Sequence, residues 1–392
     1  MALKRLIPVQ DTFIVSSLPD RNFGKDEILE LGRVEDGISR ILAKWSTSQI
    51  KSCLAKIPGK YKAILHLEIS EAEKLPASVL VIASTLPQGW AEGIGRKGDL
   101  PVEGANWKYT GLYDAEGNAI EWTVPGGATF AAYDGEFSIQ GSILNIINGR
   151  GSLVASIEKI ANGGGANVWE LESAGQIIRF YGQELVYVPD LTTDIELDVT
   201  EAVTGWRTGE DVDNTGLLIR LGNETECVNY GARISFYSKD THTIYRPYIE
   251  IRWDDSEYEP GETTECSNLF GTFSNNLREE YTTGDTVKVD LAIKDPYEPR
   301  VWSTGSIYQT KHVLPSSSYW GIKDEYTNEM VIDFNSESTK ISSNASGSFF
   351  ILDTGNLEPE RYYRLLVQVE KDNQQVIIDN KNIFRVGRNG RH

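Results

Sequence analysis

Alternating apolar and polar residues recur along the chain and constrain its fold more than any other feature. In the segment LHLEIS, Leu65, Leu67 and Ile69 lie on one side of an extended backbone, and His66 and Glu68 lie on the other. Successive side chains of a β-strand point to opposite faces of its sheet, so this period of two predicts a half-buried strand. The segments IELDV and YIEIRW repeat the pattern. We therefore expect an all-β protein whose strands each turn one face toward an apolar interior.

The length of the chain and a linker-like segment within it indicate two domains. A chain of 392 residues exceeds what one hydrophobic core usually organises. The acidic stretch DDSEYEPGETTE, with its Pro-Gly pair, follows a strong strand pattern and is typical of a linker. We predict a jelly-roll-like β-sandwich at residues 1–255, a linker at 256–265 and a second, Ig-like β-sandwich at 266–392. Residues 89–165, rich in glycine, are expected to form a long excursion from the first sandwich. The residues expected to line the interior of the first sandwich are Leu65, Leu67, Ile69, Ile195, Leu197, Val199, Ile249 and Ile251.

Helical patterns are few. Residues 46–53 and 200–206 each predict one or two turns of helix. The best candidate is SLVASIEKIAN at residues 152–162, because the glycines 163–165 that follow it are suited to ending a helix. All other segments are expected to be strands and turns.

Several fragments resemble DNRLRE-type β-sandwich domains and occur in the order found in that family. The fragments are DTFIVSSLPDRNFG, SRILAKWSTSQI, KAILHLEI, QGWAEG, IELDVTEAVTGW, ISFYSKD and YRPYIEIRW. The resemblance covers residues 8–255, interrupted by the excursion. It implies a sandwich in which SRILAKW carries the first core strand, DVTEAVTGW forms a helical turn and RPYIEIRW closes the sheet. Because most of these residues face the core, the resemblance informs about fold more than about activity.

The C-terminal part resembles an immunoglobulin-like or fibronectin-like domain. The carrying segments are GDTVKVDLAIKDPYEPR and LEPERYYRLLVQVEKDNQQVIIDNKNIFRV. The LEPERYY turn at residues 357–363 resembles a tyrosine corner, in which a tyrosine hydroxyl ties a loop to the sheet. A jelly roll joined to such a module resembles virion proteins of tailed phages, and this resemblance implies a protein of the neck, tail or baseplate.

Charge and composition disfavour several partners. The net charge is −19 and no Lys/Arg cluster stands out, so no nucleic acid is expected to bind. Polar residues interrupt every candidate membrane span, and the start lacks the apolar run of a secretory signal, so we expect no membrane and a chain made in a cytoplasm. Cys53, Cys227 and Cys266 are too scattered for a disulfide framework or a zinc site.

No catalytic or nucleotide-binding motif is present, and no cofactor is expected. His66, His242, His312 and His392 are too dispersed for a site, and His66 is expected at the surface. The acidic residues Glu210, Asp211 and Asp213, with Asn214, allow two interpretations: a calcium-binding loop or a solvated turn.

Three tryptophans, Trp90, Trp107 and Trp122, lie among the glycines of the excursion. They are the candidate binding or interface residues. One interpretation is a sugar-stacking platform, since an indole ring packs against the apolar face of a sugar. The other is that they fill the core beneath a long loop.

These patterns predict a non-enzymatic structural component of a virion that acts by assembly and surface binding. Its expected partners are other virion proteins and copies of itself, with a glycan as a further possibility. The alternative is a carbohydrate-binding module of a secreted or cell-surface protein. A third class, a polysaccharide-degrading enzyme, would need a pair of carboxylates in a groove, which sequence alone does not place.

Overall fold

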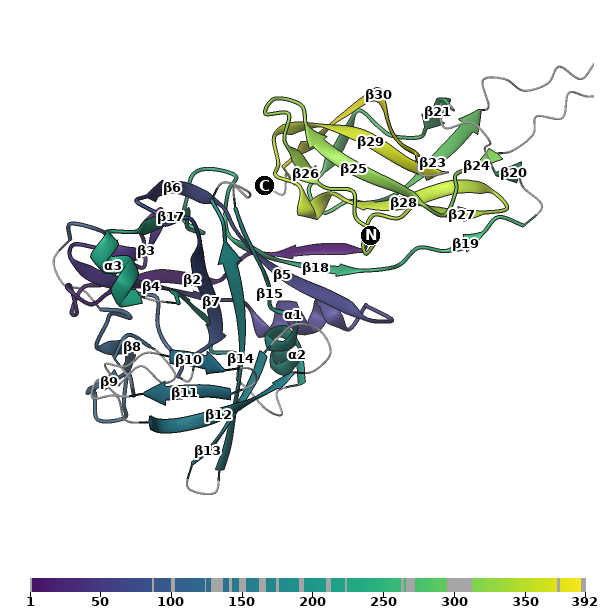
Figure 1. Ribbon diagram of the computed structural model, residues 1–392. Coiled ribbons are helices and arrows are strands. Elements are labelled where there is room, and N and C mark those ends of the chain that lie inside the picture. Colours follow the sequence, from purple (N-terminus) through teal and green to yellow (C-terminus); the bar gives the residue numbers. More distant parts are fainter. Residues whose placement is uncertain are drawn as a thin grey trace, which may run out of the picture. The chain divides into compact units, whose positions relative to one another are not determined.

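The chain forms two compact units (Figure 1). The N-terminal unit comprises Arg5–Pro58 and Lys62–Ile251, and the C-terminal unit comprises Met1–Lys4, Gly59–Tyr61 and Arg252–His392. This computed structural model describes residues 2–86, 88–99, 103–123, 125–127, 137–140, 143–147, 153–161, 167–173, 176–189, 194–208, 213–222, 224–261, 264–265, 272–294, 312–371 and 374–388. The expectation of an all-β, sandwich-type protein is confirmed, because β-sheets organise both units.

The N-terminal unit contains a large sheet and most residues of a four-stranded one, of which Leu3, Lys4, Tyr61, Arg252 and Trp253 belong to the C-terminal unit. In order across the smaller sheet, the strands are β1 (Leu3–Leu6), β18 (Tyr248–Trp253), β5 (Tyr61–Leu67) and β15 (Ile195–Asp198). Of the eight residues expected to line the interior, seven are at most 4% exposed, and Ile69 is half-buried. The period-two pattern therefore identified the buried face of these strands.

The larger sheet has twelve strands, paired antiparallel throughout. Its strands in order are β10 (Phe137–Gln140), β11 (Ile143–Ile147), β12 (Leu153–Ala161), β13 (Asn167–Ser173), β14 (Gln176–Tyr187), β7 (Val79–Thr85), β16 (Leu217–Leu221), β4 (Gly37–Lys44), β3 (Ile28–Val34), β17 (Arg233–Tyr237) and β6 (Ile69–Glu73), with β2 (Gln10–Val15) also paired to β4. The excursion contributes β10 to β12 to this sheet and a separate hairpin, β8 (Tyr109–Tyr113) with β9 (Ala119–Glu121).

The prediction of a helix at residues 152–162 is wrong, because Leu153–Ala161 within this segment form strand β12. It pairs with β11 on one side and β13 on the other. The backbone hydrogen bonds of two neighbouring strands outweigh a local helical pattern, and the β-branched residues of the segment suit a strand. The other two helices are confirmed as α1 (Thr47–Leu54) and α2 (Thr200–Thr208), while α3 (Glu224–Tyr230) was not expected. None of the helices in the described ranges is long and apolar enough to span a membrane.

The C-terminal unit has two sheets. The first contains, in order, β19 (Tyr258–Glu259), β27 (Ser342–Asn344), β28 (Gly347–Asp353), β23 (Thr286–Lys294), β24 (His312–Val313) and β20 (Thr264–Glu265), with β21 (Thr272–Asn275) on β23. The second contains β22 (Glu280–Thr282), β30 (Gln374–Gly387), β29 (Arg361–Lys371), β25 (Ser318–Asp324) and β26 (Met330–Ile332). Strands β19 and β20 fall within the segment expected as a linker, so part of that segment belongs to this sheet.

The arrangement of these strands is that of an immunoglobulin-like sandwich. Strands β21, β23, β28 and β27 correspond to A, B, E and D, and strands β25, β29 and β30 correspond to C, F and G. Trp320 on strand β25 is 2% exposed, and its ring stacks on Phe350 with centroids 4.8 Å apart. The Tyr363 hydroxyl donates to the Glu358 carbonyl at 2.7 Å, which confirms the tyrosine corner.

Residues at the other end of the chain also belong to this unit. Leu3 is 3% exposed and lies in the hydrophobic core of the C-terminal sandwich. Its carbonyl accepts a hydrogen bond from Nδ2 of Asn356, at 3.0 Å, within the short 3-10 helix η1 (Thr354–Asn356). Lys4 forms an ion pair with Asp353 at 3.2 Å. The sandwich core is therefore completed by a segment from far upstream.

Candidate functional site

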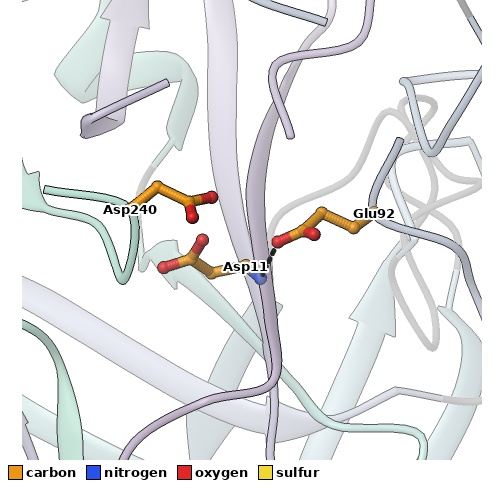
Figure 2. A group of neighbouring side chains, drawn as sticks. All are labelled: Asp11, Glu92 and Asp240. Atoms are coloured by element: carbon orange, nitrogen blue, oxygen red, sulfur yellow. Dashed lines mark hydrogen bonds between the residues drawn. The ribbon is translucent and has the colours of Figure 1, made fainter. Parts of the chain in front are cut away.

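Three carboxylates meet inside the N-terminal unit. Asp11 on β2, Glu92 in the excursion and Asp240 in the turn after β17 have carboxylate oxygens within 4.8 Å of one another (Figure 2). Asp11 is only 1% exposed, and its backbone N–H donates to Glu92 at 3.0 Å. Carboxylates this close repel one another unless positive charge lies between them.

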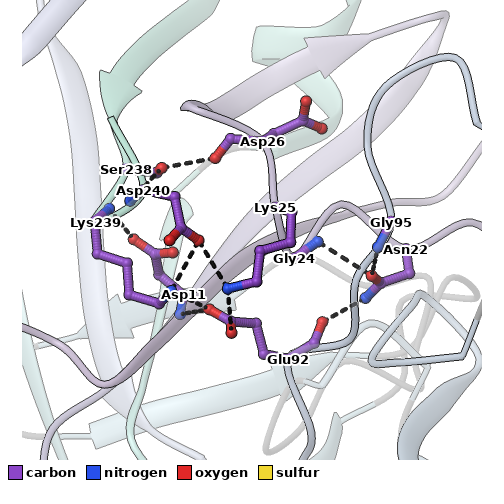
Figure 3. A network of polar contacts seen from close by, with 10 residues as sticks. All are labelled: Asp11, Asn22, Gly24, Lys25, Asp26, Glu92, Gly95, Ser238, Lys239 and Asp240. Carbon is purple, nitrogen blue, oxygen red and sulfur yellow. Dashed lines mark hydrogen bonds and ion pairs between the residues drawn. The ribbon is translucent and has the colours of Figure 1, made fainter. Parts of the chain in front are cut away.

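Two lysines supply that charge (Figure 3). The Lys25 ammonium group contacts Glu92 and Asp240, each at 3.0 Å. The Lys239 ammonium group contacts Glu92 at 2.9 Å and Asp240 at 2.8 Å, and the Lys239 backbone N–H donates to Asp11 at 2.6 Å. We call Asp11, Lys25, Glu92, Lys239 and Asp240 the charge cluster. It ties β2, the loop after it, the excursion and the turn after β17 to one another.

The charge cluster does not suit a metal ion. Three clustered carboxylates are the kind of oxygen ligands that calcium prefers. Here the ammonium groups of Lys25 and Lys239 already contact Glu92 and Asp240 and stand where a cation would have to lie. A metal would have to displace both ammonium groups, so we assign the cluster a structural role.

Burial sets the protonation of Asp11. Removal from water raises the pKa of its carboxyl group to about 7, although the N–H and the charge of Lys239 act in the opposite direction. For Asp240, hydrogen bonds from Lys239 and Lys25 outweigh burial and lower the pKa. The same contacts raise the pKa of Lys239 despite its own burial. Asp240 and Lys239 are thus charged at neutral pH, and Asp11 titrates there.

Asn22 fastens the loops beside the charge cluster. Its Oδ1 accepts from the N–H groups of Gly24 and Gly95, at 3.1 and 2.8 Å. Its Nδ2 donates to the carbonyls of Glu92 and Ala105, at 2.6 and 2.8 Å. All the main hydrogen-bonding positions of this amide are therefore used.

Glycines allow the backbone to approach Asn22 this closely. Gly93 and Gly104 have φ of 80° and 135°, and a Cβ on either would lie 2.4 or 2.5 Å from the Asn22 amide. These are positions that only glycine fits without a shift of its neighbours. Part of the glycine content of the excursion is explained in this way.

The tryptophans of the excursion do not form an exposed platform. Trp90 and Trp122 are 3% and 4% exposed and pack in one cluster with Ile14, Leu42 and Leu218. Their indole N–H groups donate to backbone carbonyls of Thr215 and Asn106. Of the two interpretations, these rings therefore match core filling, because a ring buried on both faces has none to offer a sugar.

Trp107 is half-buried, and one face of its ring is covered. The Arg40 guanidinium lies 4.7 Å from the ring centroid. Arg40 also makes two hydrogen bonds of 2.7 Å to Glu224 and one of 2.9 Å to the Gly126 carbonyl. This buried bidentate pair holds the excursion against β4 and α3.

The remaining candidates are separated. His66 is 8% exposed, so the expectation of a surface position is wrong: its ring stacks on Tyr248 with centroids 4.6 Å apart. Of the acidic group, Glu210 and Asp211 lie outside the described residues, and the Asn214 side chain donates to Trp45 and Thr47. His392 also lies outside the described residues.

Sequence reasoning missed the charge cluster, because its members lie far apart in the chain: Asp11 and Lys239 are separated by 228 residues. A signal was nevertheless present. Asp11 and Asn22 lie in DTFIVSSLPDRNFG, Glu92 in QGWAEG, and Lys239 with Asp240 in ISFYSKD. These are fragments that carry the family resemblance, and in the folded chain they converge on one place.

The fold defines the class: an all-β protein built from two sandwich-type units. No family model matches the chain, and no curated protein matches it. A solved DUF4785 family protein from Legionella pneumophila aligns over 98% of this chain at 9% identity and a TM-score of 0.15. The alignment spans 62% of that protein's length. A likeness this weak carries no argument about fold or function.

Proposed function

We propose that this chain is a non-enzymatic structural protein that works by assembling with copies of itself and with other proteins. The observation that carries the proposal is a group of exposed apolar side chains on the five-stranded sheet of the C-terminal unit. Tyr362 on β29 and Ile377 and Ile383 on β30 are 41%, 55% and 40% exposed, and Tyr326, whose ring centroid lies 6.0 Å from that of Tyr362, is 69% exposed. We call these four residues the apolar face.

The strand pattern explains why these side chains point outward. Tyr363 and Phe384, the neighbours of Tyr362 and Ile383, are 1% exposed and point into the sandwich core. Alternation along β29 and β30 therefore turns Tyr362 and Ile383 to the other side. Exposed apolar groups of this kind favour a protein interface, and tyrosine is enriched in such interfaces.

The charge cluster supports a structural role over a catalytic one. A carboxyl group with a pKa near 7 suits general acid-base chemistry, and Asp11 has one. However, a general base must come within hydrogen-bonding reach of its substrate, and Asp11 is 1% exposed. Its neighbours Glu92 and Asp240 are engaged by lysines.

The narrower proposal is a virion component of a tailed phage, in the neck, tail or baseplate. It rests on the resemblance of the two sandwich types described above. The carbohydrate-binding alternative based on Trp90, Trp107 and Trp122 is not favoured, since two of these rings are buried and the third is capped by Arg40.

Size-exclusion chromatography with light scattering tests the assembly. We expect the wild-type chain to form a discrete oligomer at micromolar concentration, and the double variant Tyr362→Ser/Ile383→Ser to be monomeric with an unchanged circular dichroism spectrum. Tyr258→Ser, which removes a tyrosine that is 39% exposed on β19, is the matched control and should leave the oligomer intact. A wild-type chain that stays monomeric and attaches to no phage particle would refute the proposal.

A further inference from the structure

A groove of about 660 Å³ lies on the outer face of the large sheet, close to its β6 edge. Its floor is formed by three neighbouring strands, since β17 pairs with β3 on one side and β6 on the other. Ser235 on β17 stands in register with Glu30 on β3 and with Glu71 on β6. The side chains of Glu30, Ser235 and Glu71 thus form a row across the floor, with the hydroxyl group between the two carboxylates. The volume is within the range of small-molecule binding sites.

The wall of the groove is held by backbone contacts between two loops. The Lys25 N–H donates to the Gly95 carbonyl at 2.9 Å, and the Lys97 N–H donates to Asp26 at 2.9 Å. Lys25 also belongs to the charge cluster, so the wall is fastened to the interior of the unit. The site is therefore preformed, which reduces the ordering cost of binding a ligand.

Positive and negative groups line the groove in equal number. The basic lining residues are Lys25, Arg96, Lys97 and Arg233. The acidic lining residues are Asp26, Glu27, Glu30 and Glu71. The groove is thus electrically balanced, although the chain as a whole carries a net charge of −19.

Most of these charges already have partners. Glu30, whose side chain is 8% exposed, accepts from Lys97 and from Arg233, each at 3.0 Å. Arg233 also contacts Glu71 at 3.3 Å. A charged ligand would meet four charges of its own sign, and its contacts with Glu30, Lys97 or Arg233 would compete with these ion pairs.

We propose that this groove binds a neutral polyhydroxylated ligand, a saccharide unit. A carboxylate paired with one or two donors still has lone pairs that can accept hydrogen bonds from hydroxyl groups. Paired ammonium and guanidinium groups still have N–H groups that can donate hydrogen bonds to hydroxyl oxygens. Sugar hydroxyls donate and accept at once, so they use both kinds of group without disturbing the ion pairs. Within the described part of the chain, the Arg96 guanidinium makes no hydrogen bond or ion pair and is free to bind such a ligand.

The proposal is independent of the assembly described above, because the groove lies wholly in the N-terminal unit and binding is measured on the full chain in solution. The probes are glucose, galactose, mannose, N-acetylglucosamine and their disaccharides, with inorganic phosphate and spermidine as charged comparators. Saturation-transfer NMR and titration calorimetry give the affinities. We expect at least one saccharide to bind with a Kd of about 1 mM or tighter.

Two substitutions at exposed positions test the location. The double variant Arg96→Gln/Glu71→Gln removes one donor and one acceptor from the groove, and we expect at least a tenfold loss of affinity. Each single substitution should give a smaller loss and serves if the double variant does not fold. Arg207→Gln makes the same chemical change at an exposed residue of α2 and should bind as the wild type does. The proposal is overturned if no saccharide binds, if phosphate or spermidine binds more tightly, or if binding survives the double variant.

Discussion

Asp11 is the residue through which pH acts on the charge cluster. Its carboxyl group is buried beside two other carboxylates, and its pKa is raised from 3.8 to about 7. Between about pH 4 and pH 7 the folded chain therefore binds a proton at Asp11 that the unfolded chain has lost. The stability that this proton provides is complete below pH 4 and is lost as the pH rises through 7.

Replacing Asp11 with asparagine is expected to remove this dependence. The free energy of unfolding of Asp11→Asn, minus that of the wild type, should be larger at pH 8 than at pH 5. The reason is that only the wild type must bury a negative charge at high pH. The slope of the difference is about 1.4 kcal/mol for each pH unit between 5 and 7. Urea unfolding at several pH values measures it.

Asp240→Asn is the comparison for this series. The pKa of Asp240 is lowered by its lysine contacts, so its stabilising effect is present above its ordinary pKa and is lost in acid. We expect this variant to be destabilised at pH 7 and to approach the wild type as the pH falls. A constant difference between Asp11→Asn and the wild type at every pH would contradict the role given to Asp11.

The tyrosine corner is a second effect of a single side chain. Tyr363→Phe removes a hydroxyl that donates to the Glu358 carbonyl at 2.7 Å. Loss of one hydrogen bond, with a carbonyl left unpaired, is expected to cost about 1–3 kcal/mol. Tyr362→Phe removes a hydroxyl from the neighbouring residue, which is 41% exposed, and should cost nearly nothing. Hydrogen exchange in the C-terminal sandwich compares the two, and equal effects would rule out the corner as the cause.

At the scale of elements, the excursion is fastened by close packing around Arg40. Gly126, with φ of 80°, lies where a Cβ would approach the Arg40 guanidinium to 2.5 Å and the Trp107 ring to 2.8 Å. The guanidinium has little freedom to move, since Glu224 holds it through two hydrogen bonds. The excursion is therefore joined to β4 and α3 by a contact that tolerates no added methyl group.

We expect Gly126→Ala to destabilise the N-terminal unit by more than the cost of placing an alanine in the left-handed backbone conformation of residue 126. Gly117 provides the control, because its φ is 85° and nothing lies within 4 Å of its added Cβ. Gly117→Ala should cost about 1–2 kcal/mol for the backbone conformation. Gly126→Ala should exceed this by at least a further 1 kcal/mol. Chemical denaturation followed by tryptophan fluorescence measures both, and equal losses would contradict the packing argument.

The sequence predicted elements well where one segment carries the whole signal. Leu65 and Leu67 alternate with polar neighbours, and both are buried as expected. Ser46 precedes α1, and its hydroxyl caps the helix by accepting from the Gln49 N–H. In each case the pattern lies within a few residues, so no distant partner is needed to interpret it.

Prediction failed where distant partners decide the outcome. Leu153–Ala161 form a strand because β11 and β13 flank them, and neither neighbour can be inferred from this segment itself. Asp11 and Asp240 belong to one cluster because the turn after β17 reaches β2, where the Lys239 N–H donates to Asp11, and no local pattern encodes this contact. His66 alternates as a surface residue does, yet Tyr248 covers it.

At the scale of the whole molecule, the C-terminal sandwich depends on residues near the other end of the chain. Leu3 fills part of its core, and Asn356 and Asp353 bind the backbone and side chain of residues 3 and 4. Leu3→Ala is therefore expected to destabilise the C-terminal unit by about 2–5 kcal/mol. Ile7→Ala, at a residue that is 38% exposed, is the control and should have little effect. Hydrogen exchange across residues 252–392 measures the change, and a loss confined to the N-terminal unit would disprove the dependence.

The position of Leu3 also determines how the sandwich can be isolated. A contiguous fragment of residues 252–392 lacks an apolar side chain and a backbone acceptor that Asn356, 353 residues downstream of Leu3, requires. Such a fragment should fold with a cavity in its core where Leu3 would lie, and the Nδ2 group of Asn356 would lack its hydrogen-bond acceptor. Supplying residues 1–4 as a peptide or a fusion would fill the cavity, and during synthesis of the intact chain this segment must stay available until the last strands emerge.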